Sequence, residues 1–254
     1  MNMPEYPFSH ELVNRLARAQ RVAALTGAGI SAESGIPTFR DPGGLWEQFK
    51  PEELANVHAF LRNPKLVQSW YAHRRSVAEE KKPNPGHEAL VELEGLVPNF
   101  LLITQNVDHL HQRAGSTKMA ELHGNITRSY CIDCGKAATE DEMMPIALGA
   151  LAQCSTCDGH IRPDVVWFGE MLPEGIMEWA GEAARQAEVF LSIGTSAVVY
   201  PAAGLPLMAR ENGAYVAEIN IEASAIAGYV DEVVLGKAGE VLPGLVQAVK
   251  EKRG

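Results

Sequence analysis

The sequence feature that most constrains the fold is a glycine-rich turn directly after a short apolar run. Residues 22–25 are apolar and long enough for a buried strand, and Gly27, Gly29 and Ala32 follow at the spacing G-x-G-x-x-G/A. In a strand–turn–helix unit the first glycine allows the tight turn, the second lets a ligand approach the backbone, and the small third residue lets the helix pack closely. The amide groups at such a helix start favour a pyrophosphate. The alternative is a glycine-rich turn without a ligand.

The residues after this turn depart from an ordinary dinucleotide-binding unit, in which a second strand ends in Asp or Glu about 20 residues further on. Residues 35–44, GIPTFRDPGG, are rich in Gly and Pro and predict a loop. Residues 45–82 carry the apolar spacing of helices, and the next predicted strand is 100–104. The sequence therefore predicts a Rossmann-type phosphate site with a long insertion after its first helix.

Short apolar runs alternate with helical segments along the rest of the chain. Further strands are expected at 189–193, 215–219 and 233–235, and helices at 9–20, 87–94, 175–187 and 241–250. This alternation predicts the α/β class, with a Rossmann-type parallel sheet and helices on both faces. Ligands of such sheets bind at the carboxyl ends of the strands. Six polar or glycine-rich segments are expected there, at 27–31, 105–108, 169–170, 194–196, 220 and 236–238. They predict a crevice for an extended ligand.

The four cysteines form two C-x-x-C pairs, Cys131 with Cys134 and Cys154 with Cys157, and 19 residues separate the pairs. Two such pairs supply four thiolates, a closed tetrahedral site for zinc. The alternative is a pair of disulfides, which a cytoplasmic setting disfavours. Because four protein ligands leave no open position for water, we predict a structural zinc that folds a small module. The four thiolates also leave no place for His160, a further candidate ligand.

The charge and the absence of a long apolar run argue against several classes of partner, although a local basic patch stays open. The formal net charge of -10 argues against nonspecific binding to nucleic acid or anionic lipid. No apolar run approaches the ~20 residues needed to span a bilayer. The first residues, MNMPEYPFSHELV, lack the basic and apolar regions of a secretory signal. We therefore expect a cytoplasmic protein that has no membrane partner.

Taken together, these segments resemble the sirtuin family. The matching segments are GAGISAESGIPTFR at 27–40, TQNVDHLH at 104–111, HG at 123–124, the paired C-x-x-C, VVWFGE at 165–170, GTS at 194–196 and IN at 219–220. The resemblance implies a Rossmann-type NAD-binding domain (1–44, 84–123 and 163–254), an inserted helical module (45–83) and a zinc-binding module (124–162). It also implies an enzyme that consumes NAD as a co-substrate to remove acyl groups from protein lysines.

The same resemblance implies roles for individual residues. His123 would be the general base on a ribose hydroxyl, a task that suits histidine near neutral pH, with Asn106 and Asp108 as further catalytic residues. His109 and His111 are rival histidines, but the family pattern assigns the base to neither. NAD would be bound by Gly27, Ala28, Gly29, Ile30, Ser31, Ala32, Phe39, Arg40, Trp46, Gln105, Asn106, Val107, Asp108, Gly194, Thr195, Ser196, Asn220 and Ala238. The substrate peptide would pair, as an added strand, with the segment that holds Val166, Phe168 and Gly169.

One further pair bears on the acyl group. Tyr71 and Arg74 stand at Y-x-x-R on a predicted helix and so share a face. A buried arginine with a tyrosine hydroxyl can hold a carboxylate by charge-assisted hydrogen bonds. With this pair, the sequence most resembles the sirtuin class that removes succinyl and malonyl groups. The small Ala55 corresponds to the position that enlarges the acyl pocket in that class. The alternative is a surface arginine beside Arg75, with Tyr71 in the core.

Three functions stay open. The first is a lysine deacylase that acts on acylated protein side chains and gives nicotinamide, O-acyl-ADP-ribose and free lysine, with deacetylation alone as a narrower form. The second is mono-ADP-ribosyl transfer to a protein, and the third is a non-catalytic NAD- or zinc-binding module. Nucleic-acid binding by the cysteine module is disfavoured, because residues 131–157 hold one basic residue, Lys136, against four acidic ones. The sequence leaves the oligomeric state open.

Overall fold

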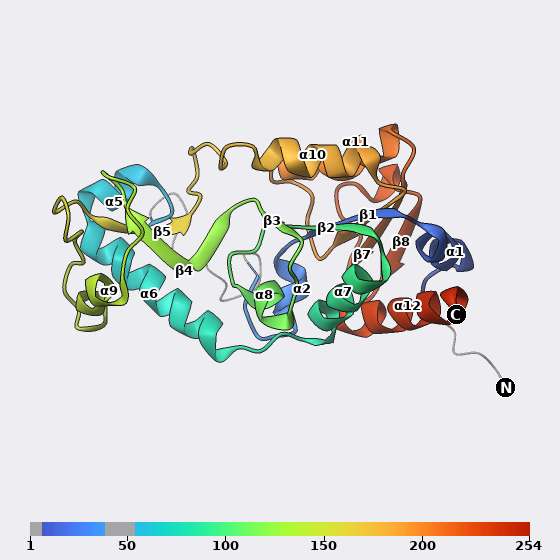
Figure 1. The fold of residues 1–254 in the computed structure, drawn as a ribbon, viewed down its shortest axis with the longest axis horizontal. Helices are drawn as coiled ribbons and strands as arrows, with labels where there is room; N and C mark the ends of the chain where they lie inside the picture. The colour runs from blue at the N-terminus through green and yellow to red at the C-terminus, as the bar shows by residue number, and fades with distance from the viewer. Residues whose placement is uncertain (1–6, 39–53) are drawn as a thin grey trace.

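A parallel sheet of six strands forms the centre of the larger of two lobes (Figure 1). The computed structural model describes residues 7–38 and 54–254. The strands of this sheet are β1 (Arg21–Thr26), β2 (Asn99–Thr104), β3 (Met119–Glu121), β6 (Val189–Ile193), β7 (Tyr215–Asn220) and β8 (Glu232–Leu235). Their order is β3-β2-β1-β6-β7-β8, and all neighbours are parallel. The order reverses between β1 and β6, where such sheets leave a crevice at the carboxyl ends of their strands.

Helices cover both faces of this sheet, as predicted. One face packs against α1 (His10–Arg18), α7 (Pro85–Leu96) and α12 (Ala238–Arg253), and the other packs against α10 (Ile176–Gln186) and α11 (Leu205–Glu211). Val22 and Ala24 of β1 enter the first core, whereas Ala23 and Leu25 enter the second. Because both faces are buried, the strands are continuous apolar runs rather than alternating ones. The short helices α2 (Ala28–Ala32) and α8 (Leu110–Ala114), and the 3-10 turns η1 (Ala202–Gly204) and η2 (Ala227–Tyr229), lie in the connections.

The smaller lobe, at the left of Figure 1, combines helices with a separate two-stranded sheet. Its elements are α5 (Val57–Arg62), α6 (Pro64–Glu80), α9 (Glu140–Ala147) and the antiparallel strands β4 (Gly124–Cys131) and β5 (Ile161–Val165). Phe60, Tyr71 and Trp167 form much of its core. The buried Gln68 of α6 donates to the carbonyls of Ala152 and Ile161 and accepts from the Ala152 amide. A fully paired side chain thus joins α6 to the cysteine module.

The predicted strands of the large sheet are confirmed to within one residue at each end. Placing residues 169–170 at the carboxyl edge of this sheet was wrong. Gly169 and Glu170 follow β5, which pairs with β4 in the second sheet. The apolar run at 165–168 looked like a sheet strand, but only Val165 lies in a strand, and the run continues into a loop. The module boundaries stay a prediction, and part of 45–83 lies outside the described residues.

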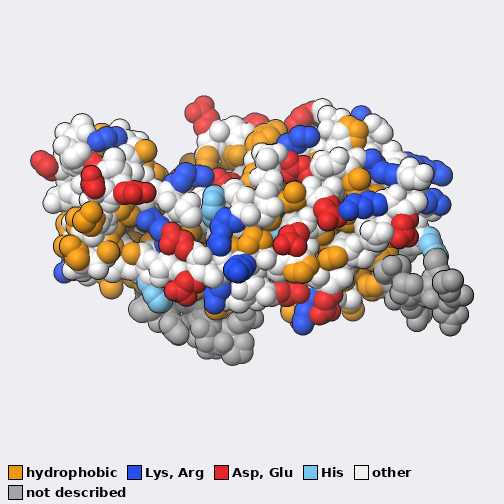
Figure 2. Space-filling model, turned by 60° about the horizontal axis from the view of Figure 1, so that its bottom comes forward, with side chains coloured by type: hydrophobic (Ala, Val, Ile, Leu, Met, Phe, Trp, Pro, Cys, Tyr) orange, Lys and Arg blue, Asp and Glu red, His pale blue; other side chains and the backbone are white. Residues whose placement is uncertain are grey.

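Neither the charge distribution seen in Figure 2 nor the helices of the described residues point to membrane binding. Figure 2 shows acidic and basic side chains interspersed over the face that carries α6, α7 and α12, so the net charge of -10 is not gathered into one patch there. Among the helices that the structure describes, none has the length and apolar character needed for a membrane crossing.

Candidate active site

The turns after β1 and β6 touch at the point where the strand order reverses. The Gly29 amide donates to the Gly194 carbonyl over 2.8 Å. A Cβ on Gly29 would lie 2.8 Å from the Cα of Gly194, and one on Gly194, whose φ is +57°, would lie 2.5 Å from the Ile30 nitrogen. The Ile30 amide donates to the Gly27 carbonyl. Two of the amides at the start of α2 are therefore used within the protein, and these glycines are needed for the contact between the turns.

Four of the predicted loops meet through side-chain hydrogen bonds at this edge. Asn106, after β2, donates from Nδ2 to the Gly27 carbonyl (3.0 Å) and to Ser31 Oγ (3.3 Å). Gln105 donates from Nε2 to Thr195 Oγ1 over 3.0 Å. Asn220, at the end of β7, donates to the Thr195 carbonyl over 3.1 Å. The structure thus brings loops from position 27 to position 220 of the chain together at one edge of the sheet.

His123 lies between β3 and β4, and its ring is held in one tautomer. Its Nδ1 lies 3.0 Å from the Gln105 carbonyl, which can only accept, so Nδ1 carries the proton. Among the residues that the structure describes, none hydrogen-bonds Nε2. Burial lowers the pKa of His123, although the bond to Gln105 acts in the opposite direction. Near neutral pH the ring is therefore uncharged, with a bare Nε2 that can accept a proton.

Asp108 is held in place on the loop after β2, which also contains Gln105. One carboxylate oxygen accepts from Ser31 Oγ at 2.7 Å, and the other accepts from the Leu110 amide at 3.0 Å. Burial raises the pKa of Asp108, and these two hydrogen bonds oppose the shift. Its carboxylate therefore ties the β2 loop to α2.

The residues predicted to contact the acyl group gather beside this loop, in the smaller lobe. Tyr71 is buried, and its Oη accepts from Trp167 Nε1 at 2.9 Å. The half-buried Arg74 lies with its guanidinium carbon 5.4 Å from the centre of the Tyr71 ring. Burial lowers the pKa of Arg74, while Tyr71 and Asp108 act against that shift. No carboxylate of the described residues forms an ion pair with Arg74. The Phe168 amide donates to the Ala55 carbonyl over 3.0 Å.

The loop after β5 is built around an ion pair that the sequence did not reveal. The buried Arg162 lies 3.6 Å over the Trp167 ring and donates from Nη2 to Glu170 Oε2 at 2.8 Å. The same oxygen accepts from the Trp167 amide at 2.7 Å. The Val166 amide donates to the His123 carbonyl, which ties this loop to the histidine. No periodic pattern in the sequence relates an arginine and a glutamate eight residues apart, so no signal pointed to this pair.

The cysteine module has the geometry of a metal site. The four Sγ atoms all lie within 4.8 Å of one another, with Cys131 and Cys157 at 3.5 Å and Cys134 and Cys154 at 3.8 Å. Zn–S bonds of about 2.3 Å in a tetrahedron place the sulfurs about 3.8 Å apart. None of the four cysteines is in a disulfide. The four thiols therefore fit zinc, and His160 is not among the clustered ligands.

The remaining predicted residues are placed as follows. Ile30 lies in the core of the larger lobe, and Ala238 starts α12 in the same core. Val107 packs against the core of the smaller lobe and so lies where the lobes meet. The others occupy the same turns, with Ala28 and Ala32 on α2, Ser196 after β6 and Gly169 after β5. Phe39, Arg40 and Trp46 lie outside the described residues.

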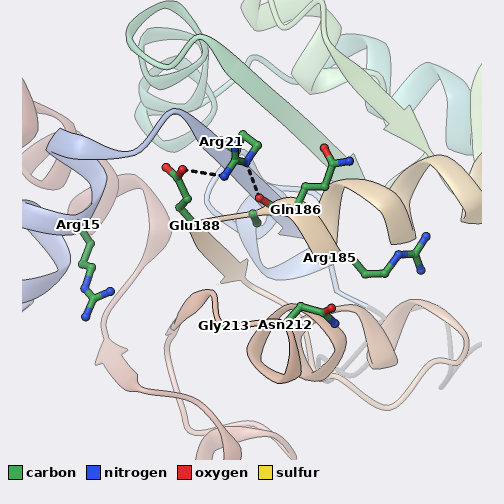
Figure 3. Close-up of a pocket in the computed structure, with 8 residues that line it drawn as sticks. Arg15, Arg21, Arg185, Gln186, Glu188, Asn212 and Gly213 are labelled. Atoms are coloured by element: carbon green, nitrogen blue, oxygen red, sulfur yellow. Dashed lines mark hydrogen bonds and ion pairs between the residues drawn. The ribbon is translucent and has the colours of Figure 1, made fainter.

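A hollow of about 580 Å³ lies at the opposite, amino-terminal edge of the sheet (Figure 3). Its lining includes Arg15, Arg21 and Arg185. Each arginine already pairs with a carboxylate, of Glu11, Glu188 and Glu182 respectively. The hollow therefore has no unpaired arginine for an anion, and the candidate site remains the group of loops at the carboxyl edge.

A wound sheet whose polar loops meet at the strand-order reversal, together with a tetrathiolate module, defines a dinucleotide-binding α/β protein with a structural metal. Comparison with known proteins is more specific. The model of the Sir2 family matches residues 27–201, and the chain belongs to this family. The resemblance to the sirtuins, as members of this family are called, is confirmed.

Its relatives match over nearly their full length. NAD-dependent protein deacylase 2 of Pyrobaculum aerophilum is 52% identical over 241 residues, which cover 93% of this chain and 94% of the relative. A crystal structure of a Sir2 homologue in complex with NAD has a TM-score of 0.90 at 42% identity, and the match covers 97% of this chain and 96% of that one. A structure of Sir2Af2 bound to a myristoylated histone peptide has a TM-score of 0.77 at 36% identity and covers 96% of each chain.

Proposed function

We propose that this protein is an NAD-dependent protein-lysine deacylase. The observation that carries the proposal is His123. Its Nδ1 donates to the carbonyl of Gln105, next to Asn106 in the loop after β2, which leaves Nε2 bare. Relatives that are named deacylases, or were solved with NAD or with an acylated peptide, support it. Acylated lysines of other proteins are the proposed partners. A cytoplasmic location is part of the proposal and is supported by the four free thiols.

In the proposed reaction acyl-lysine, NAD and water give lysine, nicotinamide and O-acyl-ADP-ribose. The bond between nicotinamide and ribose breaks, and the acyl oxygen bonds to the ribose carbon. Gln105, Asn106 and Asp108 orient the ribose and the departing amide by hydrogen bonds. His123 accepts the proton of a ribose hydroxyl at Nε2, which makes that oxygen a nucleophile toward the acyl carbon.

The remaining proposed roles concern binding. The turns of Gly27–Ala32 and Gly194–Ser196, with Asn220 and Ala238, hold the phosphates and the adenosine, and Phe39, Arg40 and Trp46 remain predicted contacts. The loop of Val166, Phe168 and Gly169 holds the peptide. Zinc, held by the four cysteines, stabilises the smaller lobe and takes no part in the reaction, because its four ligands are all from the protein.

His123→Ala tests the deacylase proposal. The variant should lose nicotinamide release from acyl-lysine peptides, by about 100-fold or more as expected for a lost general base, and should keep its zinc and its affinity for NAD. His73→Ala, at an exposed position of α6, is the matched control and should keep full activity. Mass spectrometry of the products separates free O-acyl-ADP-ribose from a protein made heavier by one ADP-ribose. Absence of nicotinamide with every acyl peptide would contradict the enzyme proposal.

We further propose that the acyl pocket prefers succinyl and malonyl groups. Arg74 is half-buried, lies against Tyr71 and has no carboxylate partner in the described part of the chain, so an acyl carboxylate would complete its pairing. The myristoyl group carried by the peptide of one relative represents the competing, apolar kind of substrate.

A panel of succinyl, malonyl, acetyl and myristoyl peptides tests this preference. Arg74→Met should lower desuccinylation about 10- to 100-fold more than deacetylation, because a charge-assisted hydrogen bond contributes about 1.5–3 kcal/mol. Arg75→Met is the control. Arg75 bonds the Ile126 carbonyl and Ser129 Oγ, so its loss should lower stability without changing the ratio of the two rates. An equal loss of both activities in Arg74→Met would refute the acidic preference.

A further inference from the structure

Trp167 lies between two residues of the loop after β5 that are proposed to hold the peptide, and its own side chain is fully buried. The amides of these neighbours, Val166 and Phe168, donate to carbonyls of the protein over 3.0 Å each. The Trp167 amide between them donates to Glu170 Oε2 at 2.7 Å. Three successive amides therefore fix the backbone that carries the indole.

The indole itself is held by a cation and by a second aromatic ring. The guanidinium carbon of Arg162 lies 3.6 Å from the centre of the Trp167 ring, and the centre of the Phe60 ring lies 5.2 Å away. Arg162 is buried, paired with Glu170, and donates to the Val165 carbonyl at 2.9 Å. A cation over an indole face is attractive, and more so where water is excluded. The position of the indole is thus set by these contacts in the core.

The indole N–H of Trp167 is used by Tyr71. Trp167 Nε1 donates to Tyr71 Oη at 2.9 Å, and an indole nitrogen can only donate. Tyr71 is therefore the acceptor in this bond and keeps its own proton for another group. Within the described part of the chain, no group accepts that proton. Burial raises the pKa of Tyr71, so the hydroxyl stays protonated at neutral pH.

Tyr71 and Arg74 together offer two donors to one ligand. They lie one turn apart on α6, and the guanidinium carbon of Arg74 is 5.4 Å from the centre of the Tyr71 ring. Burial lowers the pKa of Arg74, and the charge interaction and hydrogen bond with Tyr71 oppose this shift. A hydroxyl that still has its proton, next to a guanidinium without a carboxylate partner, matches the two oxygens of a carboxylate.

We propose that Trp167 is a positioning residue for acidic acyl groups, acting through Tyr71. By placing a donor against Tyr71 Oη, the indole leaves the tyrosine proton for a carboxylate that Arg74 holds. An acceptor at the position of the indole nitrogen would instead take that proton into the core. The inference rests on the proposed preference for succinyl and malonyl groups, and it names the residue that prepares one of the two donors.

Rates with succinyl- and acetyl-lysine peptides test this role. Trp167→Phe keeps an aromatic ring but removes the N–H donor. It should lower kcat/KM for the succinyl peptide about three- to tenfold relative to the acetyl peptide, as expected for one hydrogen bond between neutral groups. Tyr71→Phe should lower the same ratio, and adding Trp167→Phe to it should cause no further fall, because no hydroxyl is left to orient. A purely structural role would lower both rates and leave their ratio unchanged.

Trp179→Phe is the matched control, since Trp179 lies at an exposed position of α10 and should keep both rates. An unchanged ratio in Trp167→Phe, together with a lowered ratio in Arg74→Met, would refute the role of Trp167 and leave the acidic preference standing. An unchanged ratio in both variants would refute the preference, and the inference with it.

Nitrogen-15 NMR of the tryptophan-labelled protein tests the same contact without turnover. The Trp167 indole signal, assigned from its absence in Trp167→Phe, should shift when a succinyl-lysine peptide is added. A carboxylate that accepts from Tyr71 polarises the hydroxyl and so strengthens the bond from the indole. An acetyl-lysine peptide should shift the signal much less, and equal responses to the two peptides would overturn the proposal. Absence of turnover with every peptide would instead refute the proposed function, and the NMR measurement would still decide whether Trp167 responds to the acyl carboxylate.

Discussion

Acid should destabilise this protein through His87, and the structure gives the size of the effect. Burial lowers the pKa of His87 from 6.5 to about 4 in the folded protein. Below pH 6.5 the unfolded chain therefore binds a proton that the folded chain does not bind until the pH approaches 4. Stability rises with pH wherever the unfolded state binds more protons, so this contribution is fully present above pH 6.5 and is lost as the pH falls toward 4. Between pH 7.5 and pH 5 the loss is about 2 kcal/mol for this one group.

The assay compares urea unfolding of the unmodified protein and His87→Gln at several values between pH 5 and pH 7.5. The substitution has its own cost, since the Asn84 amide loses a partner, but that cost does not depend on pH. The difference between the two unfolding free energies should therefore shrink by about 2 kcal/mol as the pH falls to 5. Contributions from the cysteines are common to both proteins and cancel. A difference that stays constant from pH 7.5 to pH 5 would refute the reasoning.

Three further predictions follow from close contacts of the structure. Gly194→Ala places a Cβ 2.5 Å from the Ile30 nitrogen at a positive φ. Thermal unfolding should show that the free energy of unfolding falls by about 1–3 kcal/mol, and calorimetry should show weaker NAD binding. Unchanged values would contradict the packing of the two turns. Glu170→Gln leaves the buried Arg162 without its charge partner and should cost about 3 kcal/mol in urea unfolding, whereas a loss below about 1 kcal/mol would show that the pair is well solvated. Chelation should release one zinc per chain and unfold the smaller lobe while the large sheet persists; circular dichroism that reports no change after metal loss would contradict the structural role.

The large sheet was predictable because its strands are buried on both faces and therefore are uninterrupted apolar runs, as in residues 189–193. The elements that the sequence did not reveal lack this signal. β3 is three residues long, and β4, GNITRSYC, mixes buried, half-exposed and exposed positions that alternate neither as a strand nor as a helix. Both are specified by their partners, the edge of β2 for β3 and the strand β5 for β4.

The site was predictable at the level of loops but not of contacts. Residues directly after parallel strands reach the same edge of a sheet, which is why Gln105, Thr195 and Asn220 were correctly expected near one another. The bond from Gln105 to Thr195 depends on the strand order, because Gln105 follows β2, Thr195 follows β6, and both strands are neighbours of β1. Nothing in the sequence alone fixes that order. The pair Arg162–Glu170 was missed for a related reason, since its partners meet across a loop with no repeat.

Hydrogen bonds connect the candidate site to the buried core beneath it. The apolar pattern of β1 and β2 stops at Thr26 and Thr104, the last position of each strand, where the sheet passes from core to site. A buried hydroxyl there costs free energy unless it is paired, and in the described structure the pairing runs from Thr104 through Thr26 to His111. Thr104 Oγ1 also accepts from the Asn106 amide, so these buried groups join the core to a residue of the candidate site. Sensitivity to substitution should therefore extend below the crevice along this line, to residues that touch no substrate.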